Sequence, residues 1–467
     1  MNRLRMTCTG QAPVRENRKM SGVAAALFAA APLAFGLAAG ISSPALARSK
    51  AAVAAVPAQP RAYGLSITDF YASRGDYPLW LAPAAGGAAE DLVALLQSAK
   101  TDGLDPNAYG LDAINQALAD ARKGDRKAVV RADRLLSQAF IAYVGDMRRD
   151  PGLGIIYVEP QLKPSLPVSR VLLEDVARAP SPSAYLKSFA WMNPLYAHLR
   201  QALVDKAYDS DEHRALIALN LDRARVLPAG KQRYILVNAA EQKLFTFEDG
   251  KQLDEMRVVV GKPKYPTPMM AAFVRFAALN PYWYVPPDLA SERIAPNVLK
   301  QGLPYLKSLG YEVMSDWTEE ASIIDPKTID WKAVAAGKKD IFIRQQPGPH
   351  NSMGRMKFMF PNEAGVYLHD NPERELFSEA SRLYSGGCVR LEDAARLGQW
   401  LFGHGLDWET AATEQQVPLD RPVPVYITYL TAMPGSDGKI AYFDDVYSRD
   451  KDRLAALGLA SGAVATR

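Results

Sequence analysis

The stretch RYILVN at residues 233–238, followed by KLFTF at 243–247 and MRVVVG at 256–261, decides the fold of the second half of the chain. Each segment is short and rich in β-branched or aromatic residues, and the polar residues EDG at 248–250 mark a turn. This pattern is typical of β-strands. Three such segments in succession predict a β-meander that begins at Arg233, on which a rigid site can be built.

From Tyr63 to about Pro228 the pattern is helical instead. Apolar residues recur at helical spacing at 91–99, and GLDP at 103–106 ends that helix. Further helices are predicted at 112–121, 130–147, 196–206 and 212–224. The expected fold class is therefore α+β, and its parts are a helical domain at 63–228, a mostly β domain at 230–432 and a C-terminal tail at 433–467.

The N-terminus is typical of an export signal. Arg15, Arg18 and Lys19 precede an apolar run at 23–41, and Ala-Leu-Ala at 45–47 is a small-residue cleavage site. We expect a signal peptide at 1–47 and a flexible Ala/Pro-rich linker at 48–62. The alternative is an uncleaved membrane anchor, because the apolar run approaches the ~20 residues that a membrane span needs.

The net charge gives no support for nucleic-acid binding. The chain carries 55 Lys and Arg against 51 Asp and Glu, a formal charge of +4. Residues 1–47 hold five basic residues and one acidic residue, which accounts for that whole excess. The remainder is near neutral and has no basic cluster interleaved with aromatic residues.

A single cysteine remains after the predicted signal peptide, since Cys8 lies within it. Cys388 stands in YSGGCVRL at 384–391 and has no disulfide partner, so an exported protein needs a chemical reason to keep it. His369 ends the short apolar segment GVYLH at 365–369. An imidazole is the usual base that activates a cysteine nucleophile.

His369 together with SGGCVR at 385–390 resembles the signature of the L,D-transpeptidases with a YkuD-type catalytic domain, which is a histidine, a spacer and Ser-x-Gly-Cys-(apolar)-Arg. Two positions depart from it: Gly386 is often His in the family, and Asp370 is often Gly. Other segments that resemble this domain are TP at 267–268, NPYWYVP at 280–286, RQQPGPHN at 344–351 and KFMFPN at 357–362.

The helical region and a polar insertion at 287–339 resemble the scaffold domain and the capping subdomain of the large Gram-negative branch of this family. The small peptidoglycan-binding module that often lies between scaffold and catalytic domain has no room here. The insertion is placed to act as a lid over a substrate groove.

The resemblance implies that Cys388 is the nucleophile and His369 its base; an inert buried cysteine and a structural core histidine are the alternatives. The backbone N–H groups of Gly387 and Cys388 are expected to form the oxyanion hole. The backbone carbonyl of Asp370 would orient the imidazole. The Asp370 side chain would point to the opposite face of the strand, so it receives no role in a triad.

Other residues have two interpretations each. Arg390 either binds a substrate carboxylate or pairs with Glu392 or Asp393. Ser385 either hydrogen-bonds within the site or only shapes the turn. The candidates for lining the groove, which could equally be structural residues, are Tyr367, Trp283 and Asn351. No metal is expected, because the histidines and cysteine lack ligand spacing, and no cofactor is expected.

The reaction implied is the formation of 3→3 cross-links in the periplasm. Cys388 would attack a tetrapeptide stem of peptidoglycan, D-alanine would leave, and the diaminopimelate amine of a second stem would resolve the thioester. Carbapenems are the covalent inhibitors that the resemblance implies. Alternatives are a carboxypeptidase, a hydrolase or a wall-attachment enzyme that uses the same site, or an envelope-binding protein with an inactive site.

Overall fold

The computed structural model describes residues 64–166, 168–318 and 320–456. The predicted signal peptide and linker lie outside the described residues. Among the helices of the described ranges, none is both long and apolar enough to cross a bilayer.

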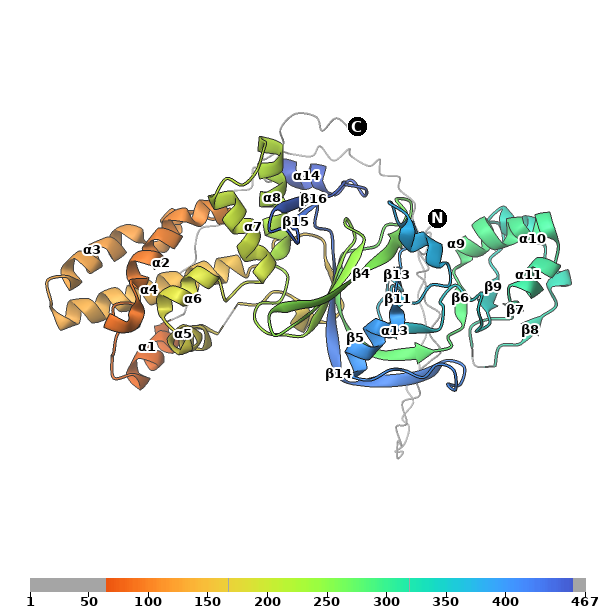
Figure 1. Cartoon of the computed structure of the whole chain (residues 1–467), viewed down its shortest axis with the longest axis horizontal. Helices are drawn as coiled ribbons and strands as arrows, with labels where there is room; N and C mark the ends of the chain where they lie inside the picture. The colour runs from red at the N-terminus through yellow and green to blue at the C-terminus, as the bar shows by residue number, and fades with distance from the viewer. Residues whose placement is uncertain (1–63, 167, 319, 457–467) are drawn as a thin grey trace, which may run out of the picture. The chain divides into compact units, whose positions relative to one another are not determined.

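The first part of the chain is helical, as predicted (Figure 1). Its core is built from apolar residues such as Leu92, Leu96, Phe140 and Trp191. Leu92 and Leu96 are four positions apart on one helix, so the helical spacing of the sequence becomes a buried face. The helices are α1 Gly64–Ser73, α2 Ala88–Gln97, α3 Leu111–Ala121, α4 Arg126–Met147, α5 Ser169–Arg178, α6 Pro182–Ser188, α7 Pro194–Val204 and α8 Asp211–Ala224.

The predicted meander is present as three antiparallel strands, β2, β3 and β4. They belong to a ten-stranded sheet in which β14 pairs with both β2 and β5, so the sheet closes on itself. One strand, β1, comes from the helical part of the chain and pairs with β5. The strands are β1 Ile156–Tyr157, β2 Tyr234–Asn238, β3 Lys243–Glu248, β4 Lys251–Gly261, β5 Met270–Leu279, β10 Met356–Met359, β11 Leu368–His369, β12 Leu383–Ser385, β13 Val389–Leu391 and β14 Gln415–Thr428.

Helix α13 (Ala394–Phe402) follows the segment that carries Cys388 and packs on the core of this sheet. Its residues Leu397 and Leu401 are buried against Phe358 of β10 and Leu368 of β11. Asp393 caps the helix by accepting a hydrogen bond from the Arg396 N–H at 2.9 Å. The segment that carries the site is therefore fixed on its core side by a capped, amphipathic helix.

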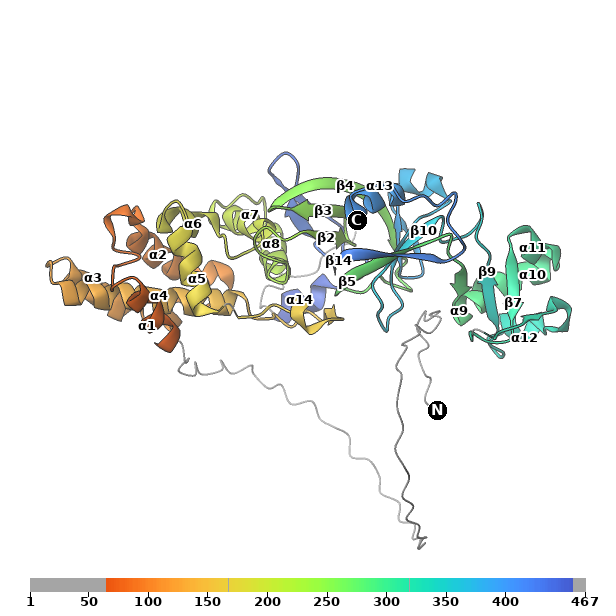
Figure 2. The same cartoon turned by 90° about the horizontal axis from the view of Figure 1, so that it is seen from below.

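The insertion predicted at 287–339 is a compact unit with its own hydrophobic core, and the flanking motif strands belong to it (Figures 1 and 2). Strand β9 lies between β6 and β7 in a four-stranded sheet of order β6-β9-β7-β8. The unit therefore begins before 287 and ends after 339. Its elements are β6 Trp283–Val285, α9 Pro287–Leu289, α10 Ala295–Gln301, α11 Pro304–Ser308, β7 Tyr311–Met314, β8 Ile323–Ile324, α12 Trp331–Ala335 and β9 Phe342–Gln345.

The residues predicted as a C-terminal tail are ordered elements as far as residue 456. Strands β15 (Ala432–Pro434) and β16 (Ile440–Tyr442) form a hairpin, and helix α14 (Asp450–Ala456) packs against α8. A buried ion pair joins Arg223 of α8 to Asp450 at 2.7 Å. The boundary predicted at residue 432 thus separates segments that pack together. No local pattern indicated this packing, because the contacts join residues that are far apart in the chain.

Candidate active site

Strands β11 and β13 carry the two candidate catalytic residues. They are parallel neighbours in which Leu368 is opposite Val389 and His369 is opposite Arg390. Leu368 and Val389 are fully buried in the core of the sheet. Side chains alternate between the two faces of a strand. His369, Arg390 and Cys388, which directly precedes β13, therefore project from the face opposite the core.

His369 is buried and held by the backbone. Its Nδ1 lies 2.6 Å from the carbonyl oxygen of Asp370. A carbonyl only accepts, so this contact assigns the proton to Nδ1 and leaves the lone pair on Nε2. Burial, with the nearby charge of Arg390, lowers the pKa of His369 to about 3, although the carbonyls of Asp370 and Met353 act in the opposite sense. The imidazole is therefore neutral near pH 7 and can accept a proton.

Cys388 is partly exposed, and its thiol donates a hydrogen bond to the Gly365 carbonyl at 3.7 Å rather than to His369. Burial raises the pKa of the thiol, against the opposing effects of hydrogen bonds from Tyr367 and of the positive charge of Arg390. A neutral thiol and a neutral imidazole differ from a preformed thiolate–imidazolium pair. Proton transfer to His369 would accompany attack, after the thiol leaves the Gly365 carbonyl.

The turn before Cys388 is closed by Ser385. Its hydroxyl accepts from the Gly387 N–H at 3.1 Å and donates to the Cys388 carbonyl at 2.5 Å. These hydrogen bonds lie within the candidate site and also close the turn. Gly387 has φ +120°, a conformation that suits glycine. Its N–H is engaged with Ser385, so it would have to exchange that partner to serve an oxyanion, while the Cys388 N–H is the second predicted donor.

The side chain of Asp370 supports the loop behind the histidine. Its carboxylate accepts from the Arg355 N–H at 2.9 Å and pairs with Arg374 at 2.7 Å. It also packs directly over Gly354, where any Cβ would collide with it. Asp370 thus offers its backbone carbonyl to the imidazole and its side chain to the loop, which agrees with excluding a triad role for the carboxylate.

Arg390 pairs with neither residue named as its alternative partner. Its Nη1 lies 2.9 Å from the carboxylate of Glu373 and 3.4 Å from Asn371 Oδ1. Glu392 and Asp393 instead bind other arginines. The Glu373 contact could not be predicted, because it depends on the loop that follows β11. A substrate carboxylate at Arg390 would compete with Glu373 for the guanidinium.

Two of the three groove candidates are structural. Trp283 is 5% exposed and belongs to the core of the insertion. Asn351 is 1% exposed and uses its amide fully: Nδ2 donates to three carbonyls at 2.9 to 3.2 Å, and Oδ1 accepts from the Met353 N–H at 2.7 Å. Neither side chain is presented to a substrate.

Tyr367 is at the site. It packs against both the core of the sheet and the core of the insertion, and its ring centroid lies 5.7 Å from that of His369. The insertion also reaches the nucleophile turn directly, since a Cβ placed on Gly386 would lie 3.7 Å from Leu289 Cδ1. Glu292 of the insertion binds the loop after β4 through Lys264 at 2.7 Å. The insertion is therefore in contact with the walls of the site.

Lys357 is a site residue that the sequence analysis did not single out. It lies opposite His369 in the pairing of β10 with β11, and it is 8% exposed. Its ammonium lies 3.4 Å from the carboxylate of Glu414. The ring centroids of Tyr284 and Tyr367 are 5.9 and 6.0 Å from the ammonium. The alternation in KFMF at 357–360 could have revealed it, because the two phenylalanines are core residues and Lys357 faces the other way.

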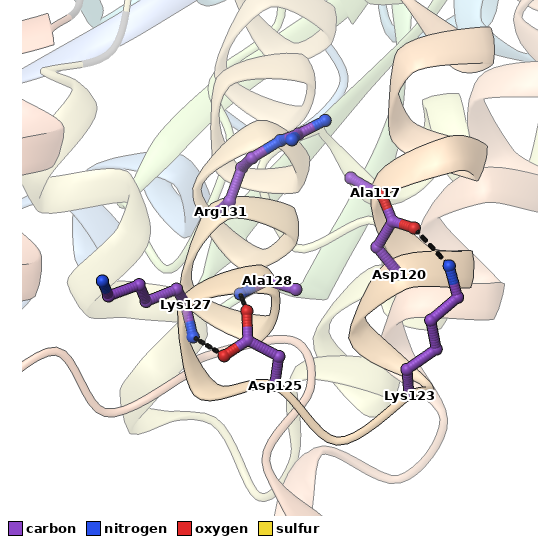
Figure 3. Close-up of a pocket in the computed structure, with 7 residues that line it drawn as sticks. All are labelled: Ala117, Asp120, Lys123, Asp125, Lys127, Ala128 and Arg131. Atoms are coloured by element: carbon purple, nitrogen blue, oxygen red, sulfur yellow. Dashed lines mark hydrogen bonds and ion pairs between the residues drawn. The ribbon is translucent and has the colours of Figure 1, made fainter.

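A hollow of about 390 Å³ lies elsewhere, between the end of α3 and the start of α4. Figure 3 shows the residues that line it. Asp120 and Lys123 form an ion pair at 2.9 Å. The Asp125 carboxylate caps α4 by accepting hydrogen bonds from the N–H groups of Lys127 and Ala128. These are local contacts within the helical domain, and no residue of the catalytic sheet lines the hollow. We assign no function to it.

Comparisons with known proteins agree with this arrangement. Residues 66–203 match a family described as the scaffold domain, and residues 232–425 match the L,D-transpeptidase catalytic domain of the YkuD type. A protein of Haemophilus influenzae that bears the name of an L,D-transpeptidase is 28% identical over 397 residues, which is 82% of this chain and 78% of the relative.

Two solved structures with weaker likeness are an L,D-transpeptidase from Mycobacterium smegmatis and one from Enterococcus faecium that carries a substitution. They are 16% and 14% identical, each with a TM-score of 0.20, and cover 44% and 43% of this chain. The chain spans 63% and 53% of their lengths. Structural similarity at this level supports no conclusion about the present chain. The two domain matches show that the chain carries a scaffold domain followed by an L,D-transpeptidase catalytic domain.

Proposed function

We propose that the protein forms 3→3 cross-links between peptidoglycan stem peptides through a Cys388 acyl-enzyme. The observation that carries the proposal is the common sheet face of Cys388 and His369, together with the buried, neutral state of the imidazole. The catalytic-domain match and the name of the relative support the same reaction class.

In the first half-reaction, the Cys388 sulfur attacks the carbonyl carbon of the third stem residue while the thiol proton passes to His369. The carbon–nitrogen bond to D-alanine then breaks, and the same proton leaves on the D-alanine amine. The second half-reaction reverses these roles. The diaminopimelate amine of another stem attacks the thioester, gives up a proton through His369, and the Cys388 thiol is regenerated.

The choice of amine over water as acceptor is supported by the insertion. Its Leu289 approaches Gly386 beside the nucleophile, and apolar cover around a thioester disfavours hydrolysis. Periplasmic location belongs to the same proposal and rests on the export signal at 1–47. The substrate, peptidoglycan, lies in that compartment.

The test is incubation of the full protein with a disaccharide-tetrapeptide, followed by mass spectrometry of the products. We expect release of D-alanine and formation of a cross-linked dimer. Cys388→Ala should abolish both while leaving the melting temperature nearly unchanged, because a smaller side chain fits the same turn. D-alanine release by folded Cys388→Ala protein would overturn the assignment of the nucleophile. Tripeptide without dimer would instead indicate a carboxypeptidase.

A further inference from the structure

Thr267 connects the nucleophile turn to the loop after β4. Its hydroxyl donates to the Gly387 carbonyl at 2.9 Å and accepts from the Gly261 N–H at 2.9 Å. The residue is fully buried. The Gly387 carbonyl belongs to the peptide bond that joins Gly387 to Cys388. Thr267 therefore helps to fix the position of the Cys388 backbone.

Thr267 is in turn held by the C-terminal segment. Arg449 Nη2 donates to the Thr267 carbonyl at 2.9 Å, and the Tyr447 hydroxyl donates to the Gly261 carbonyl at 2.5 Å. The guanidinium of Arg449 lies 4.8 Å from the ring centroid of Tyr447 and 5.0 Å from that of Tyr429. The two rings stack on each other with centroids 5.4 Å apart, and packing of the guanidinium beside them helps to hold the arginine in this direction.

The same segment is anchored at its other end to the helical domain. Arg453 of α14 donates to the Pro151 carbonyl at 2.9 Å and pairs with Asp222 of α8. Between the two arginines, Asp450 pairs with Arg223 of α8. A short piece of chain thus joins α8 to Thr267, and Thr267 to the nucleophile turn.

We propose that Arg449 is a positioning residue that acts through Thr267 on Cys388, and that this effect depends on the contact of Arg449 with Thr267 and not on the contacts of α14 with the helical domain. The proposal rests on the function proposed for Cys388. Attack requires the sulfur to lie close to both the substrate carbonyl and His369, and small misplacements of a reacting group are costly. Loss of the Arg449 contact would let the Thr267 loop, and with it the nucleophile turn, relax.

The test compares two arginines of the same segment. Arg449→Met removes the contact with Thr267 and keeps an apolar side chain beside the two rings. Arg453→Met removes a contact with the helical domain only. We expect both to lower the melting temperature, and Arg449→Met alone to lower kcat for D-alanine release from a disaccharide-tetrapeptide, on the order of 10- to 100-fold with little change in KM. Thr267→Val should share this loss, and Thr267→Ser, which keeps the hydroxyl, should recover most of it.

A second readout does not depend on turnover. The rate of alkylation of Cys388 by iodoacetamide, followed against pH, should change its midpoint in Arg449→Met and Thr267→Val but not in Arg453→Met. Unchanged kcat and unchanged alkylation in folded Arg449→Met would overturn the positioning role, as would an equal loss in Arg453→Met. If the unmodified protein releases no D-alanine, the proposed function fails, whereas the alkylation profiles still decide whether Arg449 positions the thiol.

Discussion

His369 and Arg390 stand directly opposite each other in the parallel pairing of β11 with β13. On the other side of His369, the register partner is Lys357 of β10. The imidazole therefore lies in a row between two cations. Burial is the main reason that the pKa of His369 is low, and the charges of Arg390 and Lys357 act in the same direction, so the histidine remains a neutral base.

This environment makes stability depend on pH. Folded His369 has a pKa of about 3, compared with 6.5 for the free imidazole, so the unfolded chain binds the extra proton between these values. The free energy of unfolding that the neutral His369 contributes is fully present above pH 6.5. It decreases as the pH falls from 6.5 towards 3, by up to about 1.4 kcal/mol per pH unit.

His369→Asn should remove that part of the pH dependence, which urea unfolding at pH 7.5 and 5 would measure. The matched control is His404→Asn. His404 is exposed, and its Nδ1 likewise contacts the next residue's carbonyl, that of Gly405 at 2.9 Å. If His369→Asn and the unmodified protein lose equal stability on acidification, the inferred neutral buried state of His369 is wrong.

Covalent inhibition provides a prediction for Cys388. A carbapenem should acylate the thiol and leave a stable mass increase, since a thioester in a sheltered site hydrolyses slowly. Intact-protein mass spectrometry would detect the adduct, which Cys388→Ala should lack. The control is iodoacetamide labelling under the same conditions. A thiol that takes iodoacetamide but no carbapenem would contradict a transpeptidase-like site.

The parts that local sequence determines were predictable. The strands β2 and β3 follow from β-branched and aromatic residues bounded by turn residues, and the helices α3 and α8 follow from apolar residues at helical spacing. The relation between Cys388 and His369 came only from the resemblance of the motif. Strands β11 and β13 are two and three residues long, too short for a pattern to set their register.

Contacts remote in sequence account for what was missed. For Arg390 the sequence indicated a substrate carboxylate or, alternatively, a near neighbour in the chain, and its partner in the structure is Glu373, on the loop after β11. Trp283 was a candidate for either the groove or the core, and it lies in the core of the insertion. Arg449 and Thr267 are 182 positions apart, so no local signal connects them.

Gly354 should be irreplaceable for the loop that supports His369. It has φ +64°, and a Cβ there would collide with the Asp370 carboxylate. Gly354→Ala therefore combines a strained backbone with overpacking, and we expect a loss of about 2–4 kcal/mol in the free energy of unfolding. Gly405→Ala is the control, because its Cβ would meet open space and its φ is ordinary. Denaturant unfolding of both variants would measure the difference, and equal stabilities would refute the assigned packing of Asp370 over Gly354.

The last prediction concerns the insertion as a lid. Removing residues 287–339 would take away β7, the partner of β9, so a single substitution at the contact with the nucleophile turn is the sharper test. Leu289→Ser should admit water beside the thioester. Cross-linked dimer should fall and hydrolysed tripeptide should rise, with thiol reactivity retained. Leu299→Ser, on the 48% exposed side chain of α10 in the same insertion, should leave the ratio unchanged. Mass spectrometry gives the dimer-to-tripeptide ratio, and the melting temperature gives the stability of each variant. A lid changes the ratio, whereas a purely structural segment changes only the melting temperature. An unaltered dimer-to-tripeptide ratio in folded Leu289→Ser protein would exclude the lid.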